Sequence, residues 1–374
     1  MNVIFTCGGT AGHINPAIAI ANLIREKHPD SKILFIGAAG KMEEKLVPQA
    51  GYELKCLSAS GLSRKLNFAG IKQNLYAVKC VLSAVGACKK IFREFKPDVI
   101  VGTGGYASFP ALYAGAQMGI PTCVHEANAV PGITTKLAAK KADRVLVAFA
   151  ESVQYYAKPE KVEVVGMPIR REFISTTQEQ AKKELGLEGK QVVVSAFGSL
   201  GAKKMNEAVA DMFAIEQEKG FPFHHIHATG SFGWEWMPEK VKNAGVDWEN
   251  CETIDMREYI YNMPTVMAAA DVIISRAGAS TCNEIGASRT PNILIPSPNV
   301  TNNHQEKNAR VLAEQGGSVL ILEPECTGQR LYNEVAALLA DEQRRADMAD
   351  ALKSLVRTDS TEAICRIVEE LAQR

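Results

Sequence analysis

Short apolar runs alternate with helical patterns along the whole of this 374-residue chain. A short run of branched apolar residues is typical of a strand buried on both faces, and a helix between two such strands makes them parallel. The chain is therefore expected to be an α/β protein with doubly wound, Rossmann-like parallel sheets, which bind ligands at the carboxyl ends of their strands. The expected strands are residues 3–5, 33–36, 53–57, 99–101, 122–124, 145–147, 162–165, 192–196, 224–228, 271–275 and 292–296.

The chain is too long for one hydrophobic core and suits two domains of ordinary size. The segment V-G-M-P-I-R at 165–170 joins the last strand of the first half to a new start, so a hinge is expected there. The first domain should span residues 1–165 and the second residues 166–357. The final helix, within 358–374, should be long enough to cross back to the first domain.

Charge and cysteine content limit the class of partner. The 42 basic residues balance the 42 acidic residues, so no nucleic-acid partner is expected. The 9 cysteines are scattered and include no C-x-x-C pair, which favours free thiols in a reducing cytosol over disulfides or a zinc site. No signal-peptide layout and no apolar run of ~18 residues occurs. A cytoplasmic location, or a place on a membrane surface, is expected.

Three polar, glycine-bearing loops follow strands of the first half: G-G-T-A-G-H at 8–13, G-T-G-G-Y at 102–106 and H-E-A-N-A-V-P-G at 125–132. Parallel strands bring such loops to one rim, which indicates a binding surface. The first loop is not G-x-G-x-x-G and no acid ends the second strand, so a nicotinamide dinucleotide is not expected. His13 is either a capping residue or a general base.

The second half repeats the layout of strand, glycine loop and helix. Thr177-x-x-Gln180 is a capping-box pattern that should open a helix. F-G-S-L-G-A at 197–202 follows an expected strand, and its Ser199 could either bond a phosphate or cap the next helix. No Walker pattern G-x-x-x-x-G-K-[ST] occurs, so an ATPase or kinase is not expected.

The segment D-V-I-I-S-R-A-G-A-S-T-C-N-E at 271–284 carries the clearest sign of a nucleotide. A buried strand leads into a turn of small residues, and Ser280 or Thr281 is expected to cap the helix that follows. Such a helix points unpaired N–H groups and a positive dipole end at an anion. Glu284, one turn further, could accept both hydroxyls of a ribose. The alternative is an ordinary crossover with a surface glutamate.

Residues 58–72 could reach a membrane. The helix that follows residue 68 is expected to pack its apolar face on the sheet. The remaining side chains combine apolar and basic groups that could seat the domain on an anionic bilayer surface. They are Leu62, Leu66 and Phe68 with Arg64, Lys65 and Lys72.

A set of motifs in one order covers essentially the whole chain: G-G-T-A-G-H-x-N-P, G-T-G-G-Y-A-S-F-P, H-E-A-N-A-V-P-G, V-G-M-P-I-R, F-G-S-L-G-A, and R-A-G-A-S-T-C-N-E followed by N-V-T-N-N-H-Q-E-K-N-A. With these motifs the chain resembles the MurG family of family-28 glycosyltransferases. The resemblance implies the GT-B fold of two domains with a cleft between them. It also implies a peripheral enzyme at the cytoplasmic face of the cell membrane, active in peptidoglycan synthesis and through it in cell shape and division.

The reaction that the resemblance implies is an inverting hexosyl transfer. N-acetylglucosamine would move from UDP-N-acetylglucosamine to the 4-hydroxyl of the muramyl sugar in lipid I, undecaprenyl-pyrophosphoryl-MurNAc-pentapeptide, giving lipid II with a β-1,4 link. No cofactor and no metal is expected, because no D-x-D triad offers itself to a cation. The helix N-terminus at Ser280-Thr281 and the Ser199 hydroxyl would instead stabilise the leaving diphosphate.

The resemblance further implies roles for particular residues. His13 is the expected base, and Glu126 is the alternative carboxylate. Ile260 would offer its backbone to uracil, and Glu284 would hold the ribose. The expected donor-binding residues are Thr10, Ala11, Gly12, Asn128, Arg170, Ser199, Ile260, Ala279, Ser280, Thr281, Glu284 and Gln305. The expected acceptor-side residues are Gly104, Tyr106 and His125.

Three positions depart from the family pattern and leave the geometry of the acceptor loop open. Ala11 replaces a common glycine, Ala127 a common glutamine and Met167 a common asparagine. Other functions share the architecture: a UDP-sugar 2-epimerase, another UDP-sugar-dependent GT-B transferase, or a nucleotide-sugar sensor. An epimerase would need paired acid and base groups around the sugar, and a sensor would need no acceptor side.

Overall fold

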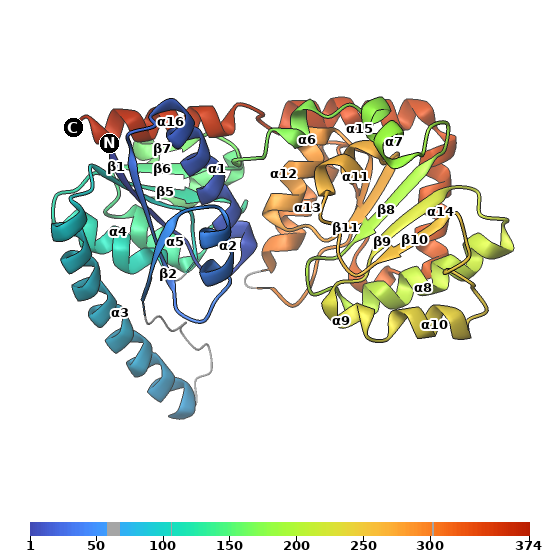
Figure 1. The fold of residues 1–374 in the computed structure, drawn as a ribbon, viewed down its shortest axis with the longest axis horizontal. Helices are drawn as coiled ribbons and strands as arrows, with labels where there is room; N and C mark the ends of the chain where they lie inside the picture. Colours follow the sequence, from blue (N-terminus) through green and yellow to red (C-terminus); the bar gives the residue numbers. More distant parts are fainter. Residues whose placement is uncertain (58–67, 106, 301–302) are drawn as a thin grey trace. The chain divides into compact units, whose positions relative to one another are not determined.

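The computed structural model describes residues 1–57, 68–105, 107–300 and 303–374, which fall into two compact units. Unit 1 comprises Met1–Ile169 and Thr358–Arg374, and unit 2 comprises Arg170–Arg357. The division follows Ile169, within the segment 165–170, whereas the expected domain boundary follows residue 165. Each unit has its own sheet and its own covering helices (Figure 1).

Several residues singled out in the sequence lie outside the described part of the chain. They are Leu62, Arg64, Lys65 and Leu66 of the expected membrane segment, and Tyr106 of the expected acceptor side. The side chains of Ala11, Phe68 and Lys72 also lie outside it.

Unit 1 holds, within its described residues, a seven-stranded parallel sheet of order β3-β2-β1-β4-β5-β6-β7. Its strands are β1 (Asn2–Thr6), β2 (Lys32–Ala38), β3 (Glu53–Leu57), β4 (Val99–Gly102), β5 (Thr122–Glu126), β6 (Arg144–Val147) and β7 (Val162–Val164). The strand order reverses between β1 and β4, whose registers pair Thr6 with Gly102. The loops after these two strands therefore meet at a topological switch point, where doubly wound sheets bind ligands.

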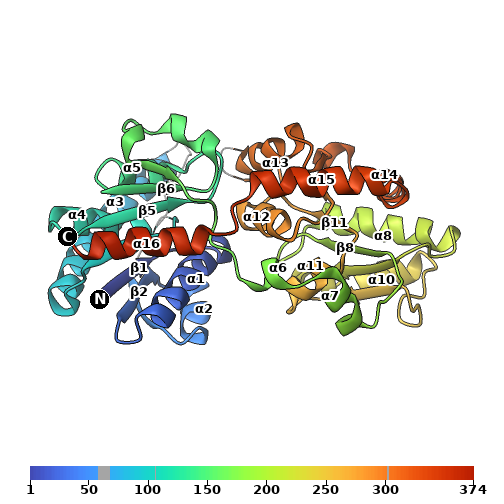
Figure 2. The ribbon, with the colours of Figure 1, turned by 90° about the horizontal axis from the view of Figure 1, so that it is seen from above.

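Helices cover both faces of this sheet. They are α1 (Ala11–Lys27), α2 (Glu43–Gln49), α3 (Phe68–Phe95), α4 (Ser108–Gln117), α5 (Ile133–Ala139) and α16 (Ser360–Ala372), with 3-10 turns η1 (Ala150–Tyr155) and η2 (Pro159–Lys161). Alternate residues of one strand enter opposite cores: Val3 and Phe5 pack with α1 and α16, and Ile4 packs with α3 and α4. Figure 2 shows α16 beside α1, so the last helix of the chain completes the core of the first unit.

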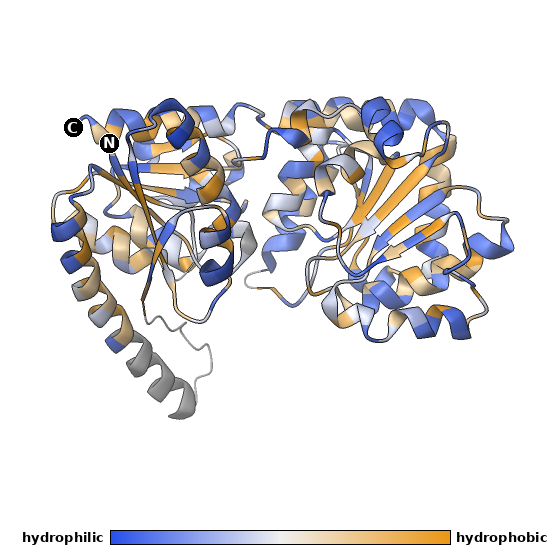
Figure 3. Cartoon of the chain, viewed as in Figure 1, coloured by the Kyte–Doolittle hydropathy of each residue, from blue (hydrophilic) through white to orange (hydrophobic). Residues whose placement is uncertain are grey.

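Unit 2 holds, within its described residues, a six-stranded parallel sheet of order β10-β9-β8-β11-β12-β13. Its strands are β8 (Val192–Ala196), β9 (His224–Ala228), β10 (Ile254–Arg257), β11 (Val272–Ser275), β12 (Asn292–Leu294) and β13 (Val319–Leu320). The hydropathy colouring of Figure 3 shows apolar residues concentrated in the strands. The expected α/β class with two Rossmann-like sheets is confirmed.

The helices of unit 2 begin and end close to sequence signals. They are α6 (Glu172–Ser175), α7 (Gln178–Leu185), α8 (Lys203–Glu218), α9 (Ser231–Trp234), α10 (Met237–Asn243), α11 (Met263–Ala269), α12 (Ala279–Ser288), α13 (His304–Glu314), η4 (Glu323–Glu325), α14 (Gly328–Ala340) and α15 (Glu342–Leu355). The capping box at Thr177 and Gln180 is confirmed, with both reciprocal hydrogen bonds present. In the described part of the chain, no helix combines the length and the apolar content that crossing a bilayer requires.

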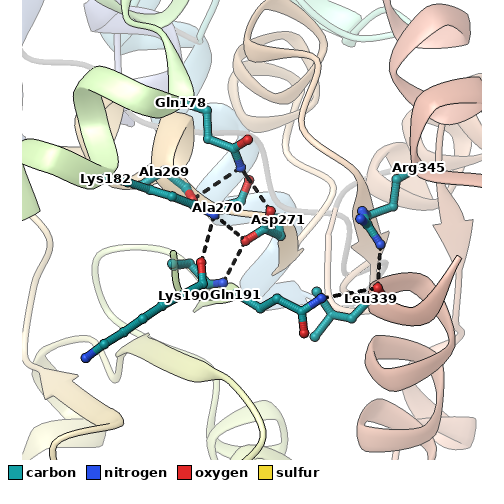
Figure 4. Close-up of polar contacts among 10 residues, drawn as sticks. Gln178, Lys182, Lys190, Gln191, Ala269, Ala270, Asp271, Leu339 and Arg345 are labelled. Atoms are coloured by element: carbon teal, nitrogen blue, oxygen red, sulfur yellow. Dashed lines mark hydrogen bonds and ion pairs between the residues drawn. The ribbon is translucent and has the colours of Figure 1, made fainter. Parts of the chain in front are cut away.

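Asp271 anchors the start of β11, the strand that leads to the expected phosphate site (Figure 4). Its carboxylate accepts hydrogen bonds from the Val192 backbone N–H at 2.7 Å and from Lys182 Nζ at 2.8 Å. Gln178 adds a bond of 3.1 Å to the other carboxylate oxygen. These bonds tie β8, β11 and α7 together at the amino end of the sheet, so the opposite end of β11 is held in a fixed register.

A fully buried polar chain joins β8, β9 and α8. Ser195 Oγ lies 2.8 Å from His225 Nε2 and 2.7 Å from His227 Nδ1, and His225 Nδ1 lies 2.7 Å from Glu216 Oε1. Burial, with a contribution from His225, lowers the pKa of His227 to about 3, so this ring is neutral at pH 7. The Ser–His–Glu arrangement resembles a nucleophilic triad, but Ser195 and both histidines have 0% exposure and cannot meet a substrate. The chain therefore fixes strand register.

Candidate active site

The loops after β1 and β4 interlock at the switch point of unit 1. Gly105 has φ 82°, and a Cβ added there would lie 2.1 Å from the Gly8 carbonyl oxygen. A Cβ at Gly8 would in turn lie 2.6 Å from the Ala107 Cβ. Only glycine permits this approach of two backbones, so the glycine loops seen in the sequence form one tightly packed element.

His13 lies in the first turn of α1, above this element. Its Nδ1 is 3.1 Å from the Thr103 carbonyl oxygen, and Thr103 Oγ1 donates to the His13 carbonyl at 2.7 Å. A carbonyl can only accept, so Nδ1 carries the proton and Nε2 is the acceptor nitrogen of the neutral ring. A Cβ at Gly104 would lie 2.8 Å from Nδ1, which makes Gly104 part of the seat of the imidazole. This tautomer suits a general base that acts through Nε2.

Thr10 and Gly12 lie on either side of the start of α1. Thr10 is the exposed N-cap residue, and its carbonyl accepts the N–H groups of His13 at 3.0 Å and Ile14 at 3.2 Å. Its side chain makes no cap hydrogen bond. Gly12 is half-buried in the first turn. These expected donor-sugar residues therefore stand next to His13 in unit 1.

Glu126 lies at the end of β5 and organises the third glycine loop. Its Oε1 accepts from the backbone N–H and the side-chain amide of Asn128, both at 3.0 Å, and its Oε2 accepts from the Gly132 N–H at 3.0 Å. The side chain is 3% exposed. Both oxygens of Glu126 are thus engaged by the loop that follows β5. The geometry therefore favours Glu126 as the brace of the loop that carries Asn128.

His125, expected on the acceptor side, has no exposed surface. Its Nε2 donates to the Gly166 carbonyl at 2.8 Å, so the ring braces the chain that follows β7. Burial lowers the pKa of His125, which keeps the ring neutral. A side chain in this position cannot touch an acceptor directly, and bracing the 166–169 segment is the role that its contacts support.

The loop after β8 in unit 2 is braced by a second pair of glycines. A Cβ at Gly201, φ 79°, would lie 2.0 Å from the Thr229 carbonyl oxygen, and a Cβ at Gly230 would lie 2.0 Å from the Gly201 nitrogen. Asn206 Nδ2 also donates to the Thr229 carbonyl at 2.7 Å. Ser199 is exposed at the tip of this loop. Because α8 starts at Lys203 with Ala202 as its N-cap, Ser199 is not a helix cap.

The expected cap of α12 is wrong. Gly278, not Ser280 or Thr281, is the N-cap, because the extended backbone (φ −64°, ψ 147°) ends there and the helix starts at Ala279. Ser280 and Thr281 lie in the first turn, half-buried, and no side chain of the described residues caps this helix. The first N–H groups of a helix have no partner inside it, so those of Ala279, Ser280 and Thr281 remain available to an anion.

Arg276 fixes the turn before α12. It donates to the Ile295 carbonyl at 3.1 Å and to Glu323 Oε2 at 2.5 Å. Both of these charged side chains are largely buried, and a buried pair with good geometry restricts the backbone that carries it. In the sequence, the only sign of this bracing role is the position of Arg276 one residue after an expected strand.

Glu284 and Arg170 lie within electrostatic reach of each other. Burial raises the pKa of Glu284 to about 7, and the positive charge of Arg170 opposes this rise. Arg170 is exposed and its guanidinium lies 5.0 Å from the centre of the Phe173 ring. The structure thus places these two expected donor residues together in unit 2, where α6 packs against α12.

Ile260 and Gln305 occupy two further segments of unit 2. The Ile260 side chain is 3% exposed and lies between the exposed Tyr259 and Tyr261, so only the backbone of Ile260 can meet a ligand. Gln305 is the second residue of α13, and its Oε1 accepts from the Ser297 N–H at 2.8 Å. Its amide nitrogen is the group left for a sugar hydroxyl.

A cavity of about 430 Å³ lies in unit 1 between α5 and η1. Its lining combines apolar groups with three lysines: Ile133, Lys136, Leu137, Ala139, Lys140, Val145, Tyr155, Tyr156, Ala157 and Lys158. Ile133 and Leu137 are exposed, and Lys136 Nζ lies 4.7 Å from the centre of the Tyr155 ring. The Tyr156 hydroxyl is buried without a partner among the described residues. The sequence did not reveal this cationic and apolar cavity.

Family models and named relatives match this chain over most of its length. Residues 3–147 match the glycosyltransferase family 28 N-terminal domain, and residues 192–364 match the family 28 C-terminal domain. A protein from Acetivibrio thermocellus named UDP-N-acetylglucosamine--N-acetylmuramyl-(pentapeptide) pyrophosphoryl-undecaprenol N-acetylglucosamine transferase is 41% identical, with 99% of this chain and 98% of that protein covered. A protein of the same name from Thermoanaerobacter sp. is 42% identical, with 99% and 100% covered.

Among solved structures, the crystal structure of Acinetobacter baumannii MurG superposes with a TM-score of 0.77 at 24% identity, and 99% of each chain is covered. At this identity the likeness supports the fold, and the curated relatives carry the assignment of the family. The chain belongs to the MurG family of family-28 glycosyltransferases.

Proposed function

We propose that this chain is the hexosyltransferase that moves N-acetylglucosamine from UDP-N-acetylglucosamine to the 4-hydroxyl of the muramyl sugar of lipid I, forming lipid II in peptidoglycan synthesis. The observation that carries this proposal is full-length identity of 41–42% to relatives named for that transfer. A UDP-sugar 2-epimerase is not favoured, because no such name occurs among these relatives. Through its product the enzyme would serve cell-wall growth, cell shape and cell division.

Unit 2 supplies the donor site in this proposal. The uncapped start of α12 offers three N–H groups to the diphosphate, and Ser199 offers an exposed hydroxyl. Glu284 accepts the ribose hydroxyls, with Arg170 beside it. Ile260 presents its backbone to the uracil edge. The Arg276–Glu323 pair and the Gly201–Gly230 packing keep these loops rigid before the donor arrives, which suits electrostatic stabilisation of a leaving group.

Unit 1 supplies the base. Nε2 of His13 takes the proton from the 4-hydroxyl while that oxygen attacks the anomeric carbon of the donor from the face opposite the leaving group. The bond from the anomeric carbon to the diphosphate oxygen breaks, and UDP leaves with its electron pair. One displacement of this kind inverts the anomeric centre. Thr103 holds the reactive tautomer, and Glu126 presents Asn128 to the sugar hydroxyls.

An anionic membrane surface is the third partner that we propose, at the cytoplasmic face of the cell membrane. The described residues that support it are those of the α5–η1 cavity, where exposed Ile133 and Leu137 stand next to Lys136, Lys140 and Lys158. Apolar side chains surrounded by lysines are the composition that binds the interface of an anionic bilayer. The acceptor carries a polyprenyl chain, so a peripheral position brings the enzyme to its substrate.

The function itself is tested by incubating the purified chain with radiolabelled UDP-N-acetylglucosamine and a lipid I analogue, with and without a chelator. We expect label in a lipid II product, one equivalent of UDP, and similar turnover in both arms. Incubation with the nucleotide sugar alone should give no new UDP-sugar. Formation of an epimeric UDP-sugar, or no transfer to lipid I, would contradict the proposal.

Replacing His13 with alanine should lower kcat by a factor of ~10²–10⁴, the usual contribution of a general base. The affinity for UDP should change little, because the uridine and diphosphate contacts lie in unit 2. The measurement is steady-state kinetics on the lipid I analogue together with UDP titration calorimetry. Near-normal turnover of His13→Ala would show that His13 is not the base.

Replacing Glu284 with alanine should raise the donor KM by about 10- to 100-fold, the loss expected for hydrogen bonds to a charged group. The ionised carboxylate is the better acceptor of ribose hydroxyls. Because the pKa of Glu284 is raised to about 7, the donor KM of the wild type should rise as the pH falls from 8 to 6. Glu284→Gln cannot titrate and should lose this dependence. A donor KM that Glu284→Ala leaves unchanged would refute the ribose role.

Reversing two charges in the α5–η1 cavity, Lys136→Glu with Lys140→Glu, should lower affinity for vesicles that contain phosphatidylglycerol by more than ~10-fold. Each lysine near an anionic surface contributes ~1 kcal/mol. The check is vesicle pelleting at fixed salt, with neutral phosphatidylcholine vesicles as a second arm. Lys219→Glu with Lys242→Glu, two exposed positions of unit 2, is the control of equal charge. Equal pelleting of both double variants would rule out this site.

A further inference from the structure

Glu43 is a fully buried acid that neither the sequence analysis nor the proposed mechanism uses. It is the first residue of α2, and its side chain has 0% exposure. No lysine or arginine of the described residues pairs with it, and its Oε2 is buried without a hydrogen-bond donor there. Burial of a carboxylate without a cation is costly, so its remaining contacts must offset a large penalty.

Those contacts lead to the glycine loop of the active site. Glu43 Oε1 accepts a hydrogen bond from the Gly9 N–H at 3.0 Å and a second from the Ala38 N–H at 3.3 Å. A Cβ at Gly8 would lie 3.2 Å from the same oxygen. The Glu43 carboxylate thus reaches from the start of α2 to the loop after β1, where it fills the space beside Gly8 and Gly9.

The Gly9 N–H is a group that a phosphate would use in a nucleotide-binding glycine loop. Here that N–H already donates its hydrogen bond to the Glu43 carboxylate. At Gly9 the first glycine loop of unit 1 therefore does not offer its N–H group to an anionic ligand. Its N–H group serves to fix the turn.

The turn at Gly9 leads directly to His13. Gly9 has φ 90°, the next residue is the N-cap of α1, and the carbonyl of that cap residue accepts the N–H of His13. On the other side the imidazole is held by the Thr103 carbonyl. Glu43 therefore fixes the backbone that leads to His13, and the Thr103 carbonyl fixes the imidazole of His13.

We propose that Glu43 is a positioning residue for His13, acting through the Gly9 turn. The proposal rests on His13 as the base of the proposed transferase. A displacement of about 1 Å at a reacting group can lower a rate by ~10²-fold. Loosening the Gly9 turn should therefore lower kcat and leave the affinity for UDP unchanged.

The test is a double-mutant cycle with Glu43→Gln and His13→Ala, measured as kcat on the lipid I analogue. Glu43→Gln keeps an acceptor oxygen but removes the charge that holds Gly9. We expect it to lower kcat by at least ~10-fold in the wild type and by less than ~2-fold in the His13→Ala background, since residues that act as a unit are not additive. An equal loss in both backgrounds, or wild-type kcat in Glu43→Gln, overturns the proposal.

Two control variants separate positioning from general damage to α2. Glu44→Gln alters the neighbouring exposed acid, which accepts a hydrogen bond from the Gly40 N–H and not from the Gly9 loop. This variant should leave kcat unchanged. Val47→Ala opens the core under the same helix and should lower the melting temperature without lowering kcat at 25 °C. A loss of kcat in Val47→Ala as large as that in Glu43→Gln would assign the effect to stability and overturn the proposal. Lipid II formation by the wild type reports on the proposed function independently of all these variants.

Discussion

The site loops of both units depend on backbone packed directly against backbone. In unit 1 the space for a Cβ at Gly105 is filled by the Gly8 carbonyl, and in unit 2 the space at Gly201 is filled by the Thr229 carbonyl. Both contacts lie where neighbouring parallel strands end at one rim, and both glycines have a positive φ. They leave the loops little freedom before any ligand binds. A rigid rim is what a site needs when it works by oriented dipoles and hydrogen bonds, because no free energy is then spent on ordering it during the reaction.

The two units share a layout but differ in the partners of the N–H groups in two of their loops. In unit 1 an N–H group of the first glycine loop is bonded to the carboxylate of Glu43, which is supplied by the protein itself. In unit 2 the start of α12 has no side-chain cap among the described residues, so its N–H groups await an anion. In unit 1 the partner of that N–H is a side chain of the protein, whereas in unit 2 the first N–H groups of α12 can bind an anion from solution. The open start of α12 supports the proposed placement of the donor diphosphate in unit 2.

The sequence predicted most strands because the central ones are short apolar runs buried on both faces, the pattern typical of a parallel strand; β3 and β7 are the more exposed exceptions. It missed β10, whose I-D-M-R alternation belongs to a strand at the edge of the sheet, and β13, which has only two residues. It misplaced the cap of α12, because small polar residues follow Gly278 and either could have capped. From the sequence, Ser199 could either bond a phosphate or cap the next helix, and the start of α8 at Lys203 excludes the cap.

Glu43 and Glu44 are indistinguishable in sequence, and only the fold shows that Glu43 is buried beside the glycine loop while Glu44 is exposed. Long-range contacts of this kind have no local signature.

The hydrogen bonds around the carboxylates of unit 1 also bear on the proposed choice of His13 as the base. Glu126 has both oxygens bonded to the loop that it organises, and Glu43 lies beneath the glycine turn with no exposed surface. Carboxylate oxygens that already accept hydrogen bonds from the loop have little capacity left for a substrate proton, and burial denies a substrate access. His13 differs on both counts: it is only half-buried, and its bond to Thr103 leaves the ring in the tautomer whose Nε2 accepts. These contacts support the proposal that His13 is the base, while Glu126 and Glu43 brace the loops that they contact.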